Sequence, residues 1–287
     1  LSIPDGNTPV AMNLVELEHG PHVAVVAKSG RDYVIYLIDM KGERQTISLG
    51  SQSRSPDTIL GLDADQDGKT DLLLLTRDKP MTMLKATDDG FKLLESKDMG
   101  QFGLVQAANA LNTDVFDIDG NGHKELLIAD KNYVRAVRYV TNPEPGVSPG
   151  WQVVQQINAR HTAAKLVSLA VLGDRIVAAD KDNSRLIVMA RNTDGASSTK
   201  SDGWKQVESL KVRGFNFNSI NAGAFSGDGK DNILAIGDSG FAVINLGGER
   251  VSLKQFAAWR TDEDRRVEHE LSGGDINGDG FTHMVAL

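Results

Sequence analysis

The sequence contains no cysteine among its 287 residues. This absence excludes disulfide bonds, thiolate nucleophiles and zinc sites built from cysteine. No apolar run is long enough to span a bilayer, so the sequence predicts no transmembrane segment. No secretory signal stands at the start. The chain begins at Leu1 rather than Met, which is compatible with a leader or an upstream region that has been removed.

Positive charge is also scarce relative to negative charge. The formal net charge is −8 and the isoelectric point is near 5.3, which argues against a general nucleic-acid binder. The composition is otherwise that of an ordinary globular protein, with 40% hydrophobic and 24% charged residues. Part of the acidity is explained if several loops are neutralised by metal ions.

Carboxylates recur at alternate positions in one segment before a glycine, and an apolar strand follows directly. Oxygen ligands for one hard cation are available at Asp63, Asp65, Asp67 and Asp71, with a backbone carbonyl near Lys69. Gly68 is expected to supply the positive φ that wraps the loop. Oxygen donors favour calcium over zinc. An EF-hand is excluded, because its twelfth position requires a bidentate glutamate and this sequence has Leu74 there.

An isolated loop of this kind is more simply an acidic turn, but the pattern repeats. The second copy offers Asp117, Asp119, Asn121 and Glu125, with a carbonyl at His123. A third keeps Asp275, Asn277 and Asp279, with a carbonyl at Phe281 and His283 in the last ligand position. A fourth, around Asp228, has Ala224 in the first ligand position. The sequence therefore predicts two complete calcium sites, a third with three side-chain ligands and a degenerate fourth.

The loop glycines reveal an internal repeat of about fifty residues. Gly68, Gly122, Gly229 and Gly280 are separated by 54, 107 and 51 positions. The long gap contains a further copy at 166–179, in which a tight turn at Gly173 replaces the loop. A first copy at 12–26 is shortened in the same way. A repeat of about this length is typical of proteins built from repeated supersecondary units.

Each unit has four short β-rich runs separated by Gly, Asn and Asp turns, with no amphipathic helix between units. The second unit shows this pattern at 58–62, 72–76, 81–86 and 91–96. It is typical of an all-β protein and specifically of a β-propeller with four-stranded antiparallel blades. We expect a single domain, 1–287, with blades at about 9–50, 57–100, 109–158, 165–213 and 218–260, and a partial sixth at 267–287. The incomplete sixth unit favours a parent with six or, preferably, seven blades.

Aromatic residues open the fourth strand in three units. Phe91, Trp151 and Trp204 each follow a glycine at this position. They are either ligand platforms or packing residues between neighbouring sheets, and a recurring strand position favours packing.

The motif Asp-x-Asp-x-Asp-Gly-x-x-Asp followed by a leucine run resembles the FG-GAP/VCBS repeats of integrin-α-like β-propellers. The similarity extends over nearly the whole chain. The resemblance implies that each loop joins the first and second strands of a blade, on the face away from the usual ligand surface. It also implies that the bound calcium has a structural role. His283, Ala224 and the two loop-free units depart from the family pattern.

The sequence contains no convincing catalytic motif. Gly237-Asp238-Ser239-Gly240 resembles the nucleophile segment of trypsin-like proteases, but the equivalent place in every unit is the turn between the second and third strands. The histidines form no His-Glu-x-x-His motif, and the sequence has no Walker loop.

The connections between blades contain candidate recognition residues. They are Arg160, His161, Phe215, Phe217, Trp259 and Arg260. Aromatic and arginine side chains contribute much of the energy of interfaces, although Phe215 and Phe217 would equally serve to fill the blade junctions.

Three hypotheses about function follow from these features. The leading hypothesis is an extracytoplasmic, calcium-stabilised binding module that recognises a protein or glycan. The second is a carbohydrate-active enzyme similar to polysaccharide lyases, with His161 as base and Arg160 neutralising a uronate. The third is an architectural domain of a longer polypeptide.

Overall fold

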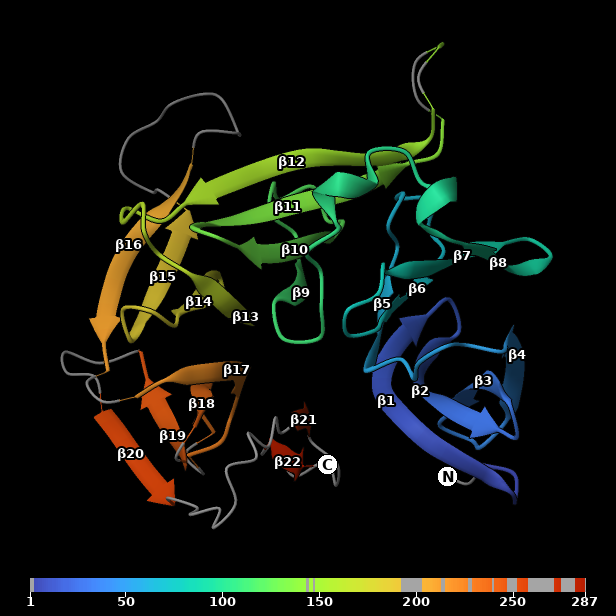
Figure 1. Ribbon diagram of the computed structural model, residues 1–287, viewed down its shortest axis with the longest axis horizontal. Coiled ribbons are helices and arrows are strands. Elements are labelled where there is room, and N and C mark those ends of the chain that lie inside the picture. Colours follow the sequence, from blue (N-terminus) through green and yellow to red (C-terminus); the bar gives the residue numbers. More distant parts are fainter. Residues whose placement is uncertain are drawn as a thin grey trace. The chain divides into compact units, whose positions relative to one another are not determined.

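A computed structural model describes residues 3–142, 145–146, 148–191, 203–212, 215–226, 229–238, 240–246, 252–257, 271–274 and 282–286. Within these ranges the regular secondary structure is almost entirely β-strand (Figure 1). Two single-turn 3₁₀ helices, η1 (Ser96–Asp98) and η2 (Phe102–Leu104), lie between β8 and β9.

Five four-stranded antiparallel sheets follow one another along the chain, each in simple meander order. The first two sheets contain β1 (Asn7–Leu17), β2 (Gly20–Ser29), β3 (Asp32–Asp39) and β4 (Arg44–Gly50), then β5 (Thr58–Leu62), β6 (Asp71–Leu75), β7 (Thr82–Thr87) and β8 (Gly90–Leu94). The third contains β9 (Thr113–Phe116), β10 (Glu125–Asp130), β11 (Tyr133–Val140) and β12 (Gly150–Asn158). The last two contain β13 (Leu166–Leu172), β14 (Arg175–Asp180), β15 (Arg185–Arg191) and β16 (Trp204–Lys211), then β17 (Phe217–Gly223), β18 (Asn232–Gly237), β19 (Gly240–Asn245) and β20 (Ser252–Ala257). A two-stranded sheet of β21 (Leu271–Gly274) and β22 (His283–Ala286) comes after them.

The predicted repeat is confirmed at the level of individual strands. In the second sheet β5 has the predicted bounds, and β6, β7 and β8 begin within one residue of their predicted starts. The tight turn at Gly173 is also confirmed, since Leu172 pairs directly with Arg175. Glycine and acidic turn residues therefore mark the strand ends in this chain, as their backbone preferences predict.

The second and third strands of the complete sheets together carry most of the buried hydrophobic residues. β6 is buried along its whole length, because its sheet is covered on both faces. Such strands lose the alternation of polar and apolar residues, which is why Leu72 to Leu75 form an unbroken leucine run.

The chain divides into two compact units. One consists of 1–110, 115–126 and 136–154, and the other of 111–114, 127–135 and 155–287. The first contains the sheets β1–β4 and β5–β8, and the second contains the sheets from β13 onward. Strands of the third sheet contribute to both units.

In the second unit, Ser168 links three consecutive sheets through one hydroxyl group. The residue lies on β13 and is fully buried. Its Oγ donates to the Leu111 carbonyl, just before β9, at 2.6 Å. The same oxygen accepts the Ile220 N–H of β17 at 3.1 Å. A small polar residue on the first strand of the fourth sheet therefore hydrogen-bonds one backbone group from each of the two neighbouring repeats.

Replacing Ser168 with alanine is expected to lower the free energy of unfolding by about 1–3 kcal/mol, because the Ile220 N–H loses a buried partner. Urea denaturation measures this effect. Ser209→Ala provides the control, since Ser209 is exposed on β16. Equal stability of the two variants would show that the hydroxyl bridge does not stabilise the fold.

Candidate metal centre

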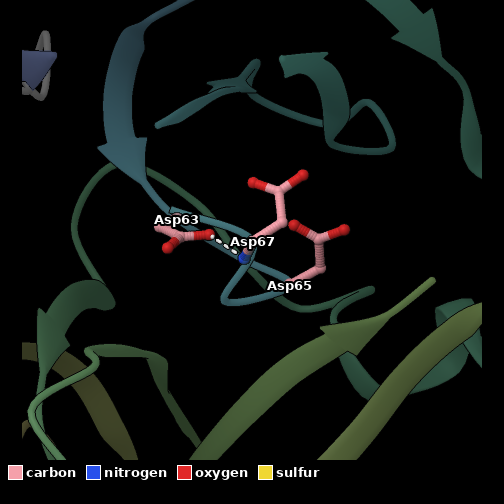
Figure 2. Close-up of side chains that lie close together, drawn as sticks. All are labelled: Asp63, Asp65 and Asp67. Atoms are coloured by element: carbon pink, nitrogen blue, oxygen red, sulfur yellow. Dashed lines mark hydrogen bonds between the residues drawn. The ribbon is translucent and has the colours of Figure 1, made fainter. Parts of the chain in front are cut away.

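The first acidic loop joins β5 to β6 and is shaped by its own side chains. The Asp63 carboxylate accepts the N–H groups of Asp67 and Gly68, each at 2.9 Å. Figure 2 shows the bond from Asp67 to Asp63, with the Asp65 and Asp67 carboxylates next to each other. Gly68 has φ +89°, so the predicted left-handed turn is confirmed.

The second loop, between β9 and β10, has the same geometry. Asp117 accepts the N–H groups of Gly120, Asn121 and Gly122 at 2.7–3.0 Å. Asn121 Oδ1 accepts the His123 N–H at 2.7 Å, as Asp67 accepts that of Lys69 at 2.9 Å in the first loop. The repeated sequence thus folds into a repeated loop, and not into two unrelated acidic turns.

When the loop positions are counted from Asp63, Asp117 and Ala224, the ninth position acts as a buried hydrogen-bond acceptor in three sheets. Its side-chain oxygen accepts the N–H of the second loop position each time, at 3.0–3.1 Å. The acceptor and donor are Asp71 and Ala64, Glu125 and Ile118, and Asn232 and Phe225. All three acceptor residues are fully buried. We define this interaction as the loop clamp.

The clamp gives a reason for the side-chain oxygen at the ninth position of three loops, including one in which another ligand is lost. Ala224 removes the first carboxylate of its loop, yet Asn232 keeps an acceptor oxygen at the clamp. In the second sheet, the other Asp71 oxygen also accepts the Ala86 N–H of β7 at 2.7 Å. Asp71 therefore ties its loop to two neighbouring strands.

Burial shifts the ionisation of both acidic clamp residues. Loss of solvent raises the pKa of Asp71 from 3.8 to about 7 and that of Glu125 from 4.5 to about 7. Backbone hydrogen bonds oppose the rise in each case. Nearby carboxylates add to it, Asp65 beside Asp71 and Asp119 beside Glu125.

These two groups give the metal-free protein a defined pH dependence. Between their unfolded and folded pKa values the folded protein binds more protons than the unfolded chain, so stability falls as pH rises through this window. We expect chelator-treated protein to lose about 1–3 kcal/mol between about pH 5 and about pH 8 in denaturant titrations. Glu125→Gln should remove the Glu125 share of this loss. A stability that rises across this range would contradict the assignment.

Each complete loop gathers three carboxylates around a common point. One oxygen from each of Asp63, Asp65 and Asp67 lies within 4.8 Å of the others. The same is true of Asp117, Asp119 and Glu125. The Asp65 side chain is only 3% exposed, and its Oδ1 is buried without a hydrogen-bond partner. A cation is the partner that such an orphaned, acceptor-only oxygen suits best, and the donor set fits calcium.

Not every predicted ligand joins these groups. Asp71 is not one of the three converging carboxylates of its loop, because both of its oxygens accept backbone N–H groups. Asn121 lies beside Asp119, to which its side-chain amide donates at 3.2 Å. The predicted ligands Asp275, Asn277, Asp279 and Phe281 lie outside the described residues, as does Asp228.

The first loop also contacts the third sheet, within the first unit. Gln66 donates through Nε2 to Glu125 of the second loop at 3.2 Å. The Ala64 carbonyl accepts the Tyr139 N–H at 2.7 Å, and the Thr141 hydroxyl donates to Asp65. The two candidate metal loops are therefore physically connected.

Three residues of this site are absent from the sequence-based prediction: Gln66, Lys85 and Thr141. Lys85, on β7, places its ammonium group 2.5 Å from Asp65 Oδ2 and 3.1 Å from Asp67 Oδ2. The pairing register of β6 with β7 identifies Lys85 as part of the site. Leu72 pairs with Leu84, so Lys85 stands opposite Asp71.

The candidate recognition residues divide into buried and exposed ones. Phe215 and Phe217 are buried in the core cluster of β13–β19, with ring centroids 4.9 Å apart, which favours the packing alternative. Arg160 and His161 are exposed, and the Arg160 guanidinium donates to the Gln206 carbonyl at 2.9 Å. Trp259 and Arg260 lie outside the described residues.

The described residues of the protease-like segment, Gly237, Asp238 and Gly240, lie where β18 leads into β19, as the repeat predicts. Gly237 pairs with Gly240 between β18 and β19. Asp238 accepts the side-chain amides of Asn216 and Asn218 at 3.2 and 3.0 Å, an arrangement that fixes a loop.

No family model and no curated protein matches the chain. Among solved structures, the β-propeller domain of Cps50 (Swd1) from Myceliophteria thermophila matches with a TM-score of 0.53 and 8% identity, over 97% of this chain and 84% of that one. The fold is a β-propeller. A protein from Lactobacillus plantarum matches with a TM-score of 0.51 and 15% identity, over 87% of this chain and 71% of that one. At these identities the likeness concerns the fold alone.

A weaker likeness is to BBS1N in complex with ARL6DN, with a TM-score of 0.44 and 13% identity over 83% of this chain. The chain described here spans 64% of the length of that chain.

Among the described residues, no helix has the length and apolar character needed to cross a membrane.

Proposed function

We propose that this chain is a calcium-stabilised β-propeller of the FG-GAP/VCBS type that acts as an extracytoplasmic binding module for a protein or glycan. The observation that carries the proposal is the pair of three-carboxylate loops, one of which holds a buried oxygen without a partner. The common loop clamp of three sheets supports the repeat family, because it gives one structural role to the ninth position of the motif.

Calcium would bind through Asp63, Asp65 and Asp67 in the first loop and through Asp117, Asp119 and Glu125 in the second. When bound, the ion supplies the positive charge that relieves repulsion among these carboxylates. The chain's own residues fix the loop, since Asp63 and Asp117 hold the backbone N–H groups before any ion arrives. Neutral ligands such as Asn121 favour modest affinity, which suits calcium-rich compartments outside the cytoplasm.

Calcium is expected to raise the melting temperature, because a ligand that binds only the folded state adds about 2.7 kcal/mol at a hundredfold excess over its dissociation constant. For a chain of this size that corresponds to a shift of roughly 5–10 °C. The double variant Asp63→Asn/Asp117→Asn should lose most of the response. Asp174→Asn is the control, since the Asp174 side chain is 97% exposed in the tight turn of the unit that lacks an acidic loop. An equal shift in all three proteins would refute these two sites.

The recognition half of the proposal rests on the exposed blade connections. His161 is the residue to substitute, because it is exposed. Arg160 donates a hydrogen bond to the Gln206 carbonyl, and Phe215 and Phe217 are buried, so substituting them would also affect stability. Screening immobilised glycans and then comparing wild type with His161→Ala should show binding that weakens in the variant while the melting temperature is retained. Unchanged binding would place the recognition surface elsewhere. Unsaturated products from acidic polysaccharides would instead support the enzymatic alternative.

A further inference from the structure

Lys85 occupies an unusual place for a lysine on a β-sheet. Its side chain is only 13% exposed, and its ammonium group lies between the Asp65 and Asp67 carboxylates, at 2.5 and 3.1 Å. Lysine side chains normally extend so that the charge reaches water. The two hydrogen bonds of Lys85 to carboxylates favour the charged ammonium. The lysine is therefore held as a cation inside the loop.

The position of Lys85 is part of a pattern that recurs in other sheets. Lys85 stands opposite the acidic clamp residue Asp71 in the β6–β7 register. In the third sheet, Arg138 of β11 lies close enough to the acidic clamp residue Glu125 for its charge to lower the Glu125 pKa. In the fifth sheet the clamp residue is neutral, and its opposite is Asn245, next to the pair Ile233 and Ile244. A basic residue thus accompanies the acidic clamps, and an amide accompanies the amide clamp.

The contacts of Lys85 compete directly with those of a metal ion. Calcium takes six to eight oxygen ligands and needs the carboxylates to face the ion. The ammonium group uses Asp65 Oδ2 and Asp67 Oδ2 and leaves Asp65 Oδ1 without a partner. An ion that engages both carboxylates must therefore share them with the lysine or displace it.

We propose that Lys85 is a tethered cation that competes with calcium for Asp65 and Asp67, and so sets the calcium affinity of the first loop. The inference rests on the proposed calcium function of that loop. It predicts that the loop keeps its form at low calcium, because the lysine neutralises part of its charge. It also predicts that calcium binds more tightly once the lysine charge is removed, since like charges at this distance repel strongly.

Calcium titration calorimetry on the full chain tests this inference with Lys85→Met and Lys85→Gln. The glutamine variant keeps hydrogen-bond donors and guards against loss of folding in the methionine variant. We expect the affinity of one site to increase at least about tenfold in both, and the gain to disappear when Asp63→Ala is added. Chelator-treated Lys85→Met should also melt at a lower temperature than wild type and recover on addition of calcium. Lys92→Met, an exposed lysine on β8 with the same charge change, serves as the control.

The outcomes separate this inference from the function on which it rests. Tighter binding in both variants, or binding in the variants but not in wild type, supports the competition. Equal affinities and equal calcium-free melting temperatures for wild type and Lys85→Met overturn it while leaving the calcium function standing. If wild type and variants alike bind no calcium, both are refuted.

Discussion

Replacing Asp71 with alanine is expected to lower the free energy of unfolding by about 2–5 kcal/mol. The substitution removes the acceptor of the buried Ala64 N–H and of the half-buried Ala86 N–H, at roughly 1–3 kcal/mol each with the larger cost at Ala64. Relief from burying a carboxylate offsets part of this cost, because that burial already raises the Asp71 pKa to about 7. Calcium-free urea denaturation at neutral pH measures the change in stability.

Two further variants make this prediction specific to the clamp. Asp71→Asn should lie between wild type and Asp71→Ala, since the amide retains one acceptor oxygen but points a donor at the second N–H. Asp88→Ala removes an exposed carboxylate of the same sheet and should change stability by less than about 0.5 kcal/mol. If the alanine and asparagine variants were equally stable, the hydrogen bonds would not be the source of the effect.

Trp151→Ala is expected to cost about 3–5 kcal/mol, the range for removing a large buried aromatic residue. The Trp151 side chain is fully buried on β12 and packs edge-on against Tyr139, with ring centroids 5.4 Å apart. Thermal or urea unfolding would report the loss. Trp151→Phe should recover a large part of it by refilling the cavity.

Trp204 provides the matched control for this substitution. It occupies the equivalent start of the outer strand β16, but it is half-buried, with the Arg191 guanidinium 5.7 Å from its ring centroid. We expect Trp204→Ala to cost about 1–2 kcal/mol, because less apolar surface leaves the core. If Trp204→Ala and Trp151→Ala lowered the free energy of unfolding equally, burial would not determine how much these positions contribute to stability.

The same tryptophans show what the sequence could predict. Recurrence of an aromatic residue after a glycine favours packing over ligand binding, and the burial of Trp151 confirms this for its sheet. The strands and the left-handed turn at Gly68 were also predictable, since both depend on residues adjacent in the chain.

Contacts that depend on strand register were not predictable. The connection from β6 to β7 runs through six residues, 76–81, so counting along the chain does not show that Lys85 stands opposite Asp71. The sequence indicates only a metal ligand at the ninth position, because an acceptor for a backbone N–H and a ligand for calcium require the same oxygen. Burial and the hydrogen-bond partner of Asp71 distinguish the two roles, and both follow from tertiary structure.

A crystal structure of the full chain grown with excess calcium, with anomalous scattering measured at a long wavelength, would show whether both loops bind calcium. We expect an anomalous peak in each of the two loops, with oxygen distances of about 2.3–2.6 Å. One ion should lie at Asp63, Asp65 and Asp67 and the other at Asp117, Asp119 and Glu125. Loops that keep the geometry described here but show no anomalous density at saturating calcium would contradict this expectation.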